Sequence, residues 1–218
     1  MSVKHILKSL AFFNTLNNEQ IEQLCSISCV VSYDEEYLLH YEKQETQQLL
    51  FLTQGLAKSY KIDKHENEIF LYYIYKNNML SEISNIQDDT ISSFSNIQFL
   101  EKSQILSIDY PAFKEQFLNK NLLCMEFANE VIQHANKMQN LINREFIFDS
   151  VAKVSMMLSS DLEMFNKLKR HDIALILHIQ PATLSRVLNR LKRNAIIDII
   201  HGKVTVLNMN KLQSIYQE

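Results

Sequence analysis

Between Leu168 and Val206 the hydrophobic pattern predicts two short helices, a tight link between them and then a two-stranded hairpin. A first helix is predicted there, with Asp172 in its opening turn, where a negative charge suits the helix dipole. Its apolar positions are Ile173, Leu175, Ile176 and Leu177. The link 178–180 precedes a second helix that begins at Pro181, where a missing N–H loses no hydrogen bond. The apolar residues of this second helix recur at three- and four-residue steps, at Leu184, Val187, Leu188 and Leu191.

The opposite face of the second helix is polar and cationic. It carries hydroxyl, amide and guanidinium groups, which are the types that reach base edges and phosphates. These residues are Thr183, Ser185, Arg186, Asn189, Arg190 and Arg193. After the helix, the β-branched run 196–200, the turn signal His201-Gly202 and the alternating run 203–207 predict a hairpin. The pattern is typical of a winged helix-turn-helix, and the alternative is two surface helices of an ordinary bundle.

The segment Ala182-Thr183-Leu184-Ser185-Arg186 resembles the start of the recognition helix in the CRP/FNR family of bacterial transcription regulators. The family has glutamate where this chain has Ala182, whose methyl group cannot accept a hydrogen bond from cytosine but can pack on a thymine methyl. Two family glycines are replaced by His178 in the link and Ala195 after the helix. Histidine tolerates a positive φ better than alanine does.

The resemblance implies a set of DNA contacts. Ser185 and Arg186 match the base- and phosphate-contacting positions of the family, and Thr183 is a further base reader. Pro181 and Ala182 complete the start of the expected DNA-binding helix. The phosphate candidates are Arg190, Arg193, Lys169, Arg170, His171 and Lys203. The expected partners are a palindromic double-stranded operator and a second copy of the chain, with RNA polymerase as a further candidate.

The N-terminal two thirds has a different pattern. Asn17 to Gln20 carries a capping signal for a short helix. From Val30 to Ile108, short β-branched and aromatic runs alternate with polar breaks, which predicts an antiparallel barrel or sandwich. The hairpin around Gly55 and the strand exit at 108–113 resemble the β-roll sensor domain of the same family. Five asparagines are expected in left-handed turn positions: Asn67, Asn77, Asn78, Asn85 and Asn96.

The expected effector differs from that of the best-known members. Ser81-Glu82-Ile83 stands where cyclic-nucleotide-binding members have Gly-Glu-Leu, and no arginine precedes Arg144. A buried phosphodiester without a cation is poorly compensated, so cAMP is not expected. Three cysteines do not form the four-ligand set of an iron–sulfur cluster. They are Cys25, Cys29 and Cys124. The effector candidates are Ser81, Glu82 and His134.

A long helix without proline or glycine is predicted over 121–144. Its apolar positions step by three and four residues, which is a heptad seam. The seam consists of Cys124, Phe127, Val131, His134, Met138 and Leu141. In the family the equivalent helix pairs with its copy across a two-fold axis. His134 has two interpretations. It is a partly buried, hydrogen-bonded residue, or it is a haem ligand or effector contact. Haem is the candidate cofactor, and the effector is not identified.

Composition adds an asymmetry of charge. The net charge is −3, but residues 146–218 carry ten Lys+Arg against six Asp+Glu, whereas residues 1–145 carry twelve against nineteen. A cationic C-terminal part suits a polyanionic partner. No eighteen-residue apolar window and no cleavage signal is found, which indicates a cytoplasmic protein without a membrane span.

The resulting prediction is an α+β chain in three parts: a β-roll sensor over 1–120, a dimerisation helix over 121–145 and a winged helix-turn-helix over 146–218. The predicted function is effector-controlled, sequence-specific DNA binding as a homodimer. The alternative is a ligand-binding or interaction module whose C-terminal domain docks a partner protein. An enzyme is not expected, because the nucleophile, phosphate-loop and zinc motifs are missing.

Overall fold

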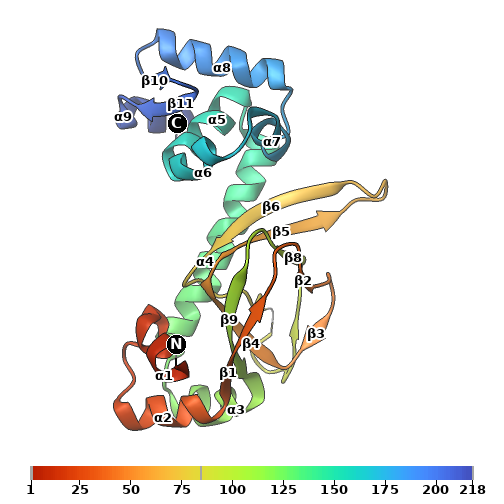
Figure 1. Cartoon of the computed structure of the whole chain (residues 1–218), viewed down its shortest axis with the longest axis vertical. Coiled ribbons are helices and arrows are strands. Elements are labelled where there is room, and N and C mark those ends of the chain that lie inside the picture. The colour runs from red at the N-terminus through yellow and green to blue at the C-terminus, as the bar shows by residue number, and fades with distance from the viewer. Residues whose placement is uncertain (1, 84, 218) are drawn as a thin grey trace. The chain divides into compact units, whose positions relative to one another are not determined.

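The computed structural model describes residues 2–83 and 85–217. The chain forms two compact units, Met1–Lys137 and Met138–Glu218 (Figure 1). The long helix α4 (Cys124–Ile142) begins in the first unit and ends in the second. None of the helices in the described residues is long and apolar enough to cross a membrane.

The first unit opens with short helices. They are α1 (Val3–Ser9), the 3₁₀ turn η1 (Ala11–Phe13) and α2 (Asn18–Ser26). The predicted capping signal is confirmed, because the Asn17 side chain accepts from the Gln20 N–H while the Gln20 side chain accepts from the Asn17 N–H. This reciprocal cap satisfies two N–H groups that the first turn leaves without helical partners.

The strands form the expected antiparallel roll. They are β1 (Ser28–Tyr33), β2 (Leu38–His40), β3 (Glu45–Thr46), β4 (Gln48–Gln54), β5 (Leu56–Ile62), β6 (Glu68–Tyr75), β7 (Ile91–Ser92), β8 (Asn96–Phe99) and β9 (Ser103–Asp109). Their hydrogen-bonded orders are β1-β9-β4, β2-β8-β5-β6 and β3-β7. Each apolar run of the sequence analysis lies in one or two of these strands.

Two apolar clusters hold this unit together. One joins the N-terminal helices to β4, β9 and α3 (Tyr110–Gln116) through fully buried rings such as Phe13, Phe51 and Phe113. The other fills the space inside the strands around Leu52, Ile97 and Phe99. Gly55 joins β4 to β5 with φ of +101°, and a Cβ there would overlap the Ser103 side chain, so this turn requires glycine.

The asparagine prediction is mostly wrong. Among the five asparagines, only Asn77 has a positive φ, and Asn96 lies in β8. Other left-handed turn positions are occupied by charged residues, namely Glu36, Lys43 and Glu66. Exposed turns tolerate this strain because the surrounding strands hold their ends in place.

A short connection leads to the long helix. After α3 come the turn η2 (Leu118–Lys120) and then α4, which covers 124–142 of the expected 121–144. The next five residues, η3 (Asn143–Ile147), form a π-helical turn. A π turn widens the helix by one residue and often occurs at functional positions.

The second unit is mainly helical. Its elements are η3, α5 (Ser150–Ser160), α6 (Leu162–Lys167), α7 (Arg170–Ile176), α8 (Pro181–Arg193), β10 (Ile197–Ile200), β11 (Lys203–Val206) and α9 (Met209–Gln217). Phe165, Ile173, Leu184 and Leu212 are at most 1% exposed in a single core. That core fixes α7, α8 and the hairpin as one rigid piece.

Candidate nucleic-acid interface

Helices α7 and α8 meet in the tight link that the sequence predicts. α7 ends at Ile176, Leu177 caps it, and His178 takes a φ of +50° before α8 begins at Pro181. The expected apolar set of α7 needs one correction. Leu175 is 60% exposed, whereas Ala174 is buried with Ile173 and Leu177. The helix register turns positions 173, 174 and 177 to the core, and residue type alone does not reveal this.

α8 presents one apolar and one polar face, as predicted. Its buried residues are Leu184, Val187, Leu188 and Leu191. At 3.6 residues per turn, the opposite side of the helix is a straight row with steps of four, three and four residues. This row consists of Ala182, Arg186, Asn189 and Arg193, all exposed. We call it the reading row. Ser185 lies beside it, and its hydroxyl donates to the Pro181 carbonyl at 3.1 Å.

The predicted hairpin follows α8 directly. Ile197 pairs with Val206 and Ile200 with Lys203, so the exposed turn is His201-Gly202, with φ of 49° and 80°. Ala195 also has a positive φ of 53°, which an alanine adopts only under strain. Lys192 of α8 bonds Asp198 at 2.9 Å and donates to the Ile199 carbonyl at 3.2 Å. This pair joins the end of α8 to the hairpin.

Arg170 has a structural contact that the sequence analysis missed. Its Nη2 donates to the Gly202 carbonyl at 2.7 Å, and its guanidinium stacks over the Phe165 ring at 4.8 Å. Burial lowers the pKa of this guanidinium. Arg170 therefore anchors the hairpin turn, unlike Lys169, His171 and Lys203, which are exposed as phosphate contacts need to be.

A charged network ties the link to the π-helical turn. His178 Nδ1 lies 2.7 Å from Glu145 Oε2, and Arg144 Nε donates to Glu145 Oε1 at 2.8 Å. Burial raises the pKa of Glu145, but the hydrogen bonds from His178 and Arg144 outweigh it and leave the pKa lowered. The sequence carries no local signal for this contact, because residues 145 and 178 are far apart in the chain.

The effector candidates of the first unit lie in a second polar network. Glu82 is 6% exposed and accepts hydrogen bonds from the Tyr72 hydroxyl at 2.6 Å, the Phe94 N–H at 2.7 Å and the Ser95 hydroxyl at 3.2 Å. Ser81 instead accepts from the Leu50 N–H and donates to the Gln48 carbonyl. Glu82 therefore already has three donors from its own chain.

Helix α4 reaches this network through Tyr72. The His134 ring meets the Tyr72 ring edge-on at 6.3 Å, and Lys137 Nζ lies 5.5 Å from the centre of the same ring. Burial, followed by the charge of Glu82, raises the pKa of Tyr72, and burial lowers the pKa of His134. The structure thus brings Glu82 and His134 to one tyrosine.

The surroundings of His134 do not fit a haem. The cavity that His134 lines with Ser81, Phe127 and Glu130 has a volume of about 10 Å³. A cofactor pocket typically needs roughly 300 Å³ or more. The described surroundings of His134 therefore leave no room for a haem.

The buried His40 predicts a pH dependence for the stability of the first unit. His40 is 7% exposed, and burial lowers its pKa despite the opposing effects of Glu82 and Gln44. Since its folded-state pKa lies below the ordinary 6.5, the unfolded chain binds the proton first as the pH falls. The free energy of unfolding should therefore decrease below pH 6.5, by at most about 1.4 kcal/mol per pH unit for one proton.

This dependence can be measured by urea unfolding between pH 7.5 and pH 5.0. The variant His40→Gln should show a shallower decrease than the wild type. Equal slopes in His40→Gln and the wild type would contradict the assignment.

Comparisons with known proteins agree with this geometry. Residues 156–215 match the Crp-like helix-turn-helix domain family. FixK2 from Bradyrhizobium japonicum has a TM-score of 0.64 at 14% identity over 88% of this chain and 98% of its own. A CooA mutant from Carboxydothermus hydrogenoformans has a TM-score of 0.64 at 16% identity over 88% and 89%. A structure assigned to the crp/fnr family, from Eubacterium rectale, has a TM-score of 0.59 at 16% identity over 96% and 99%. No curated protein matches the chain.

Proposed function

We propose that the chain is a sequence-specific, DNA-binding transcription regulator, because residues 156–215 match the Crp-like helix-turn-helix domain and the fold is that of CRP/FNR structures. The observation that carries this proposal is the reading row of α8. A helix with an exposed row of amide and guanidinium groups, held by a core on its other side, suits the major groove.

The residues divide into base readers and phosphate contacts. Arg186 projects from the middle of the reading row, with Ser185 and the half-buried Thr183 on its flanks. Ala182 presents a methyl group near Pro181, at the start of the helix, where contact with a thymine methyl is favourable. The phosphate contacts that the geometry favours are Arg190, Arg193, Lys169, His171 and Lys203, all exposed. Arg170 is removed from this set because the hairpin turn occupies its guanidinium.

The chain pairs with a second copy through a face of α4 that shares only Val131 with the predicted seam. Phe127 is 3% exposed and belongs to the core of its own unit, and His134 packs on Tyr72. Four exposed apolar residues each follow a seam residue by one position in the sequence. They therefore form a neighbouring row on α4, with steps of three, four and three residues. They are Met125, Ala128, Ile132 and Ala135, beside Val131. We call these five residues the pairing face.

Pairing across a two-fold axis makes DNA recognition two-fold as well. Two α8 helices then contact half-sites about 34 Å apart, one turn of B-DNA, so the operator is palindromic. The Tyr72 network, which joins β6 to α4, is the route by which a signal in the first unit biases the position of α4. Such a signal acts only if it binds one arrangement better than the other.

The salt dependence of binding tests the proposal. An operator is first selected from random duplexes with the full chain, and its affinity is measured by fluorescence anisotropy at 50 to 200 mM salt. Neutralisation of six to ten phosphates by a dimer predicts a loss of about 10³- to 10⁵-fold over this range. An affinity that barely changes with salt would contradict DNA binding through the cationic face of the second unit.

A further inference from the structure

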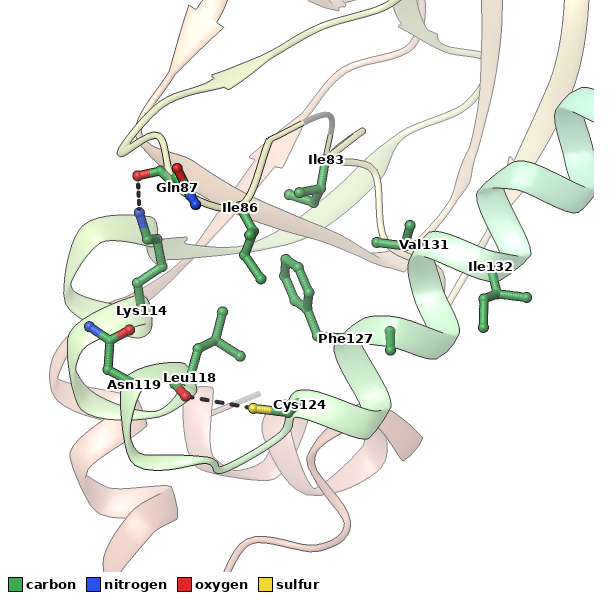
Figure 2. A pocket seen from close by; sticks show the side chains of 11 residues that line it. Ile83, Ile86, Gln87, Lys114, Leu118, Asn119, Cys124, Phe127, Val131 and Ile132 are labelled. Atoms are coloured by element: carbon green, nitrogen blue, oxygen red, sulfur yellow. Dashed lines mark hydrogen bonds between the residues drawn. The ribbon is translucent and has the colours of Figure 1, made fainter.

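The first unit contains a pocket of about 860 Å³ that the Tyr72 network does not use (Figure 2). Its walls come from the loop residues Ile83, Ile86 and Gln87, from α3 and η2, and from the first turns of α4. Phe127 and Leu118, 3% and 8% exposed, line it from the core. The volume is within the range of about 300–1,000 Å³ that is typical of small-molecule sites.

The lining is apolar except at one end. Figure 2 shows the side chains of Ile83 and Ile86 pointing towards Phe127, with Val131 and Ile132 on the α4 side. The polar side chains of Gln87, Lys114 and Asn119 gather on the opposite side. This segregation suits a ligand with an apolar body and one polar end, because the body then leaves water while the polar end keeps hydrogen-bonding groups beside the exposed Gln87 and Asn119.

The charge at the polar end is already balanced. Lys114 Nζ bonds Asp89 Oδ1 at 2.9 Å and donates to the carbonyls of Gln87 at 3.0 Å and Asp88 at 2.9 Å. These three bonds use the three donors of the ammonium group. The carboxylates of Asp88 and Asp89 also repel an incoming anion, so this end disfavours a carboxylate or phosphate.

Neutral hydrogen-bonding groups remain at the same end. Gln87 and Asn119 are both exposed, so their side-chain amides face solvent at this end of the pocket. Each amide can donate to or accept from an uncharged group.

We infer that this pocket binds a neutral, mainly apolar small molecule that places one carbonyl or hydroxyl group between Gln87 and Asn119. The pocket shares Ala128, Val131 and Ile132 with the pairing face, so an occupant changes the surface that a second copy meets. Its role as the regulatory signal rests on the proposed function, whereas ligand binding itself does not.

The test uses the full chain without DNA and the neutral apolar probe N-phenyl-1-naphthylamine. Its fluorescence should rise on binding, with one site per chain. Ile86→Asp, which adds a charge at a 52% exposed lining residue, should weaken binding at least about tenfold. Ile62→Asp, a matched change at a 49% exposed isoleucine of β5 outside the pocket, should leave binding unchanged. Equal probe binding by wild type and Ile86→Asp would overturn the assignment of the pocket.

Competition in the wild type tests the ligand class without any mutation. Decanol should displace the probe at least about tenfold better than decanoate, which has the same chain length but carries a charge. Equal or better displacement by decanoate would overturn the neutral class. Loss of probe binding at concentrations where the chain sediments as a dimer would also overturn the proposal, since the second copy would then fill the pocket. Failure of operator binding would leave all of these results unchanged.

Discussion

Replacing Arg186 by alanine is expected to weaken binding to the selected operator by roughly 5- to 150-fold, the equivalent of one lost bidentate contact to a base. Arg186 is exposed in the middle of the reading row, and Leu184, Val187 and Leu188 hold its helix from the other side. Because the side chain has no part in the core, the thermal unfolding midpoint should not change. The affinity is measured by anisotropy at fixed salt, with an unrelated duplex as the reference for non-specific binding.

Lys211→Ala is the matched control for this variant. Lys211 is an exposed cation of α9 in the same unit, so its removal changes the net charge equally without touching the reading row. We expect less than about a twofold loss of operator affinity, as for a distant charge under screening. If Arg186→Ala binds the operator as tightly as Lys211→Ala does, α8 is not the reading helix.

Replacing Ile132 by lysine is expected to convert a dimer into monomers. Ile132 is 56% exposed in the single chain, so the substitution should fold. In a two-fold pair it would place two ammonium groups near the axis of an apolar contact, which weakens association by about 100-fold or more. Sedimentation velocity measures the monomer fraction directly. As the dimer dissociates, affinity for the full palindrome should decrease, whereas affinity for a single half-site should stay the same.

Gln133→Lys provides the control on the neighbouring exposed position of the same helix. It adds the same charge outside the pairing face and should leave the dimer intact. Two results together would contradict the pairing face and support the seam that the sequence predicts. The dimer would survive Ile132→Lys, and it would dissociate in a Phe127→Leu variant that still folds.

Local patterns were sufficient for the elements of both units. The α8 amphipathicity, the proline at its first position and the hairpin after it are set by residues within a few positions of one another. The strands of the roll follow from β-branched and aromatic runs for the same reason. The exposed position of Arg186 was identified in this way, because its neighbours on the helix determine its face.

The pairing face shows where a periodic pattern is not sufficient. Phe127 and Ile132 are both apolar and both lie on a regular row of α4, yet one packs inside its own unit and the other is exposed. A heptad pattern predicts that an apolar face will be covered. It does not indicate whether the cover is the same chain or a second copy, because both satisfy the same hydrophobic requirement.

By itself, then, the sequence determined the strands of the roll, the α7–α8 pair, the hairpin and the exposed position of Arg186, since each depends on contacts between near neighbours. Tertiary structure alone decided that Arg170 anchors the hairpin turn and that Glu145 meets His178. It also decided that Glu82 is satisfied by Tyr72, Phe94 and Ser95, and that Ile86, Leu118 and Phe127 line one pocket. The physical reason is common to all four. Each contact joins segments that are distant in the chain, and folding brings their hydrogen-bonding and apolar groups together only when the whole core of a unit has formed.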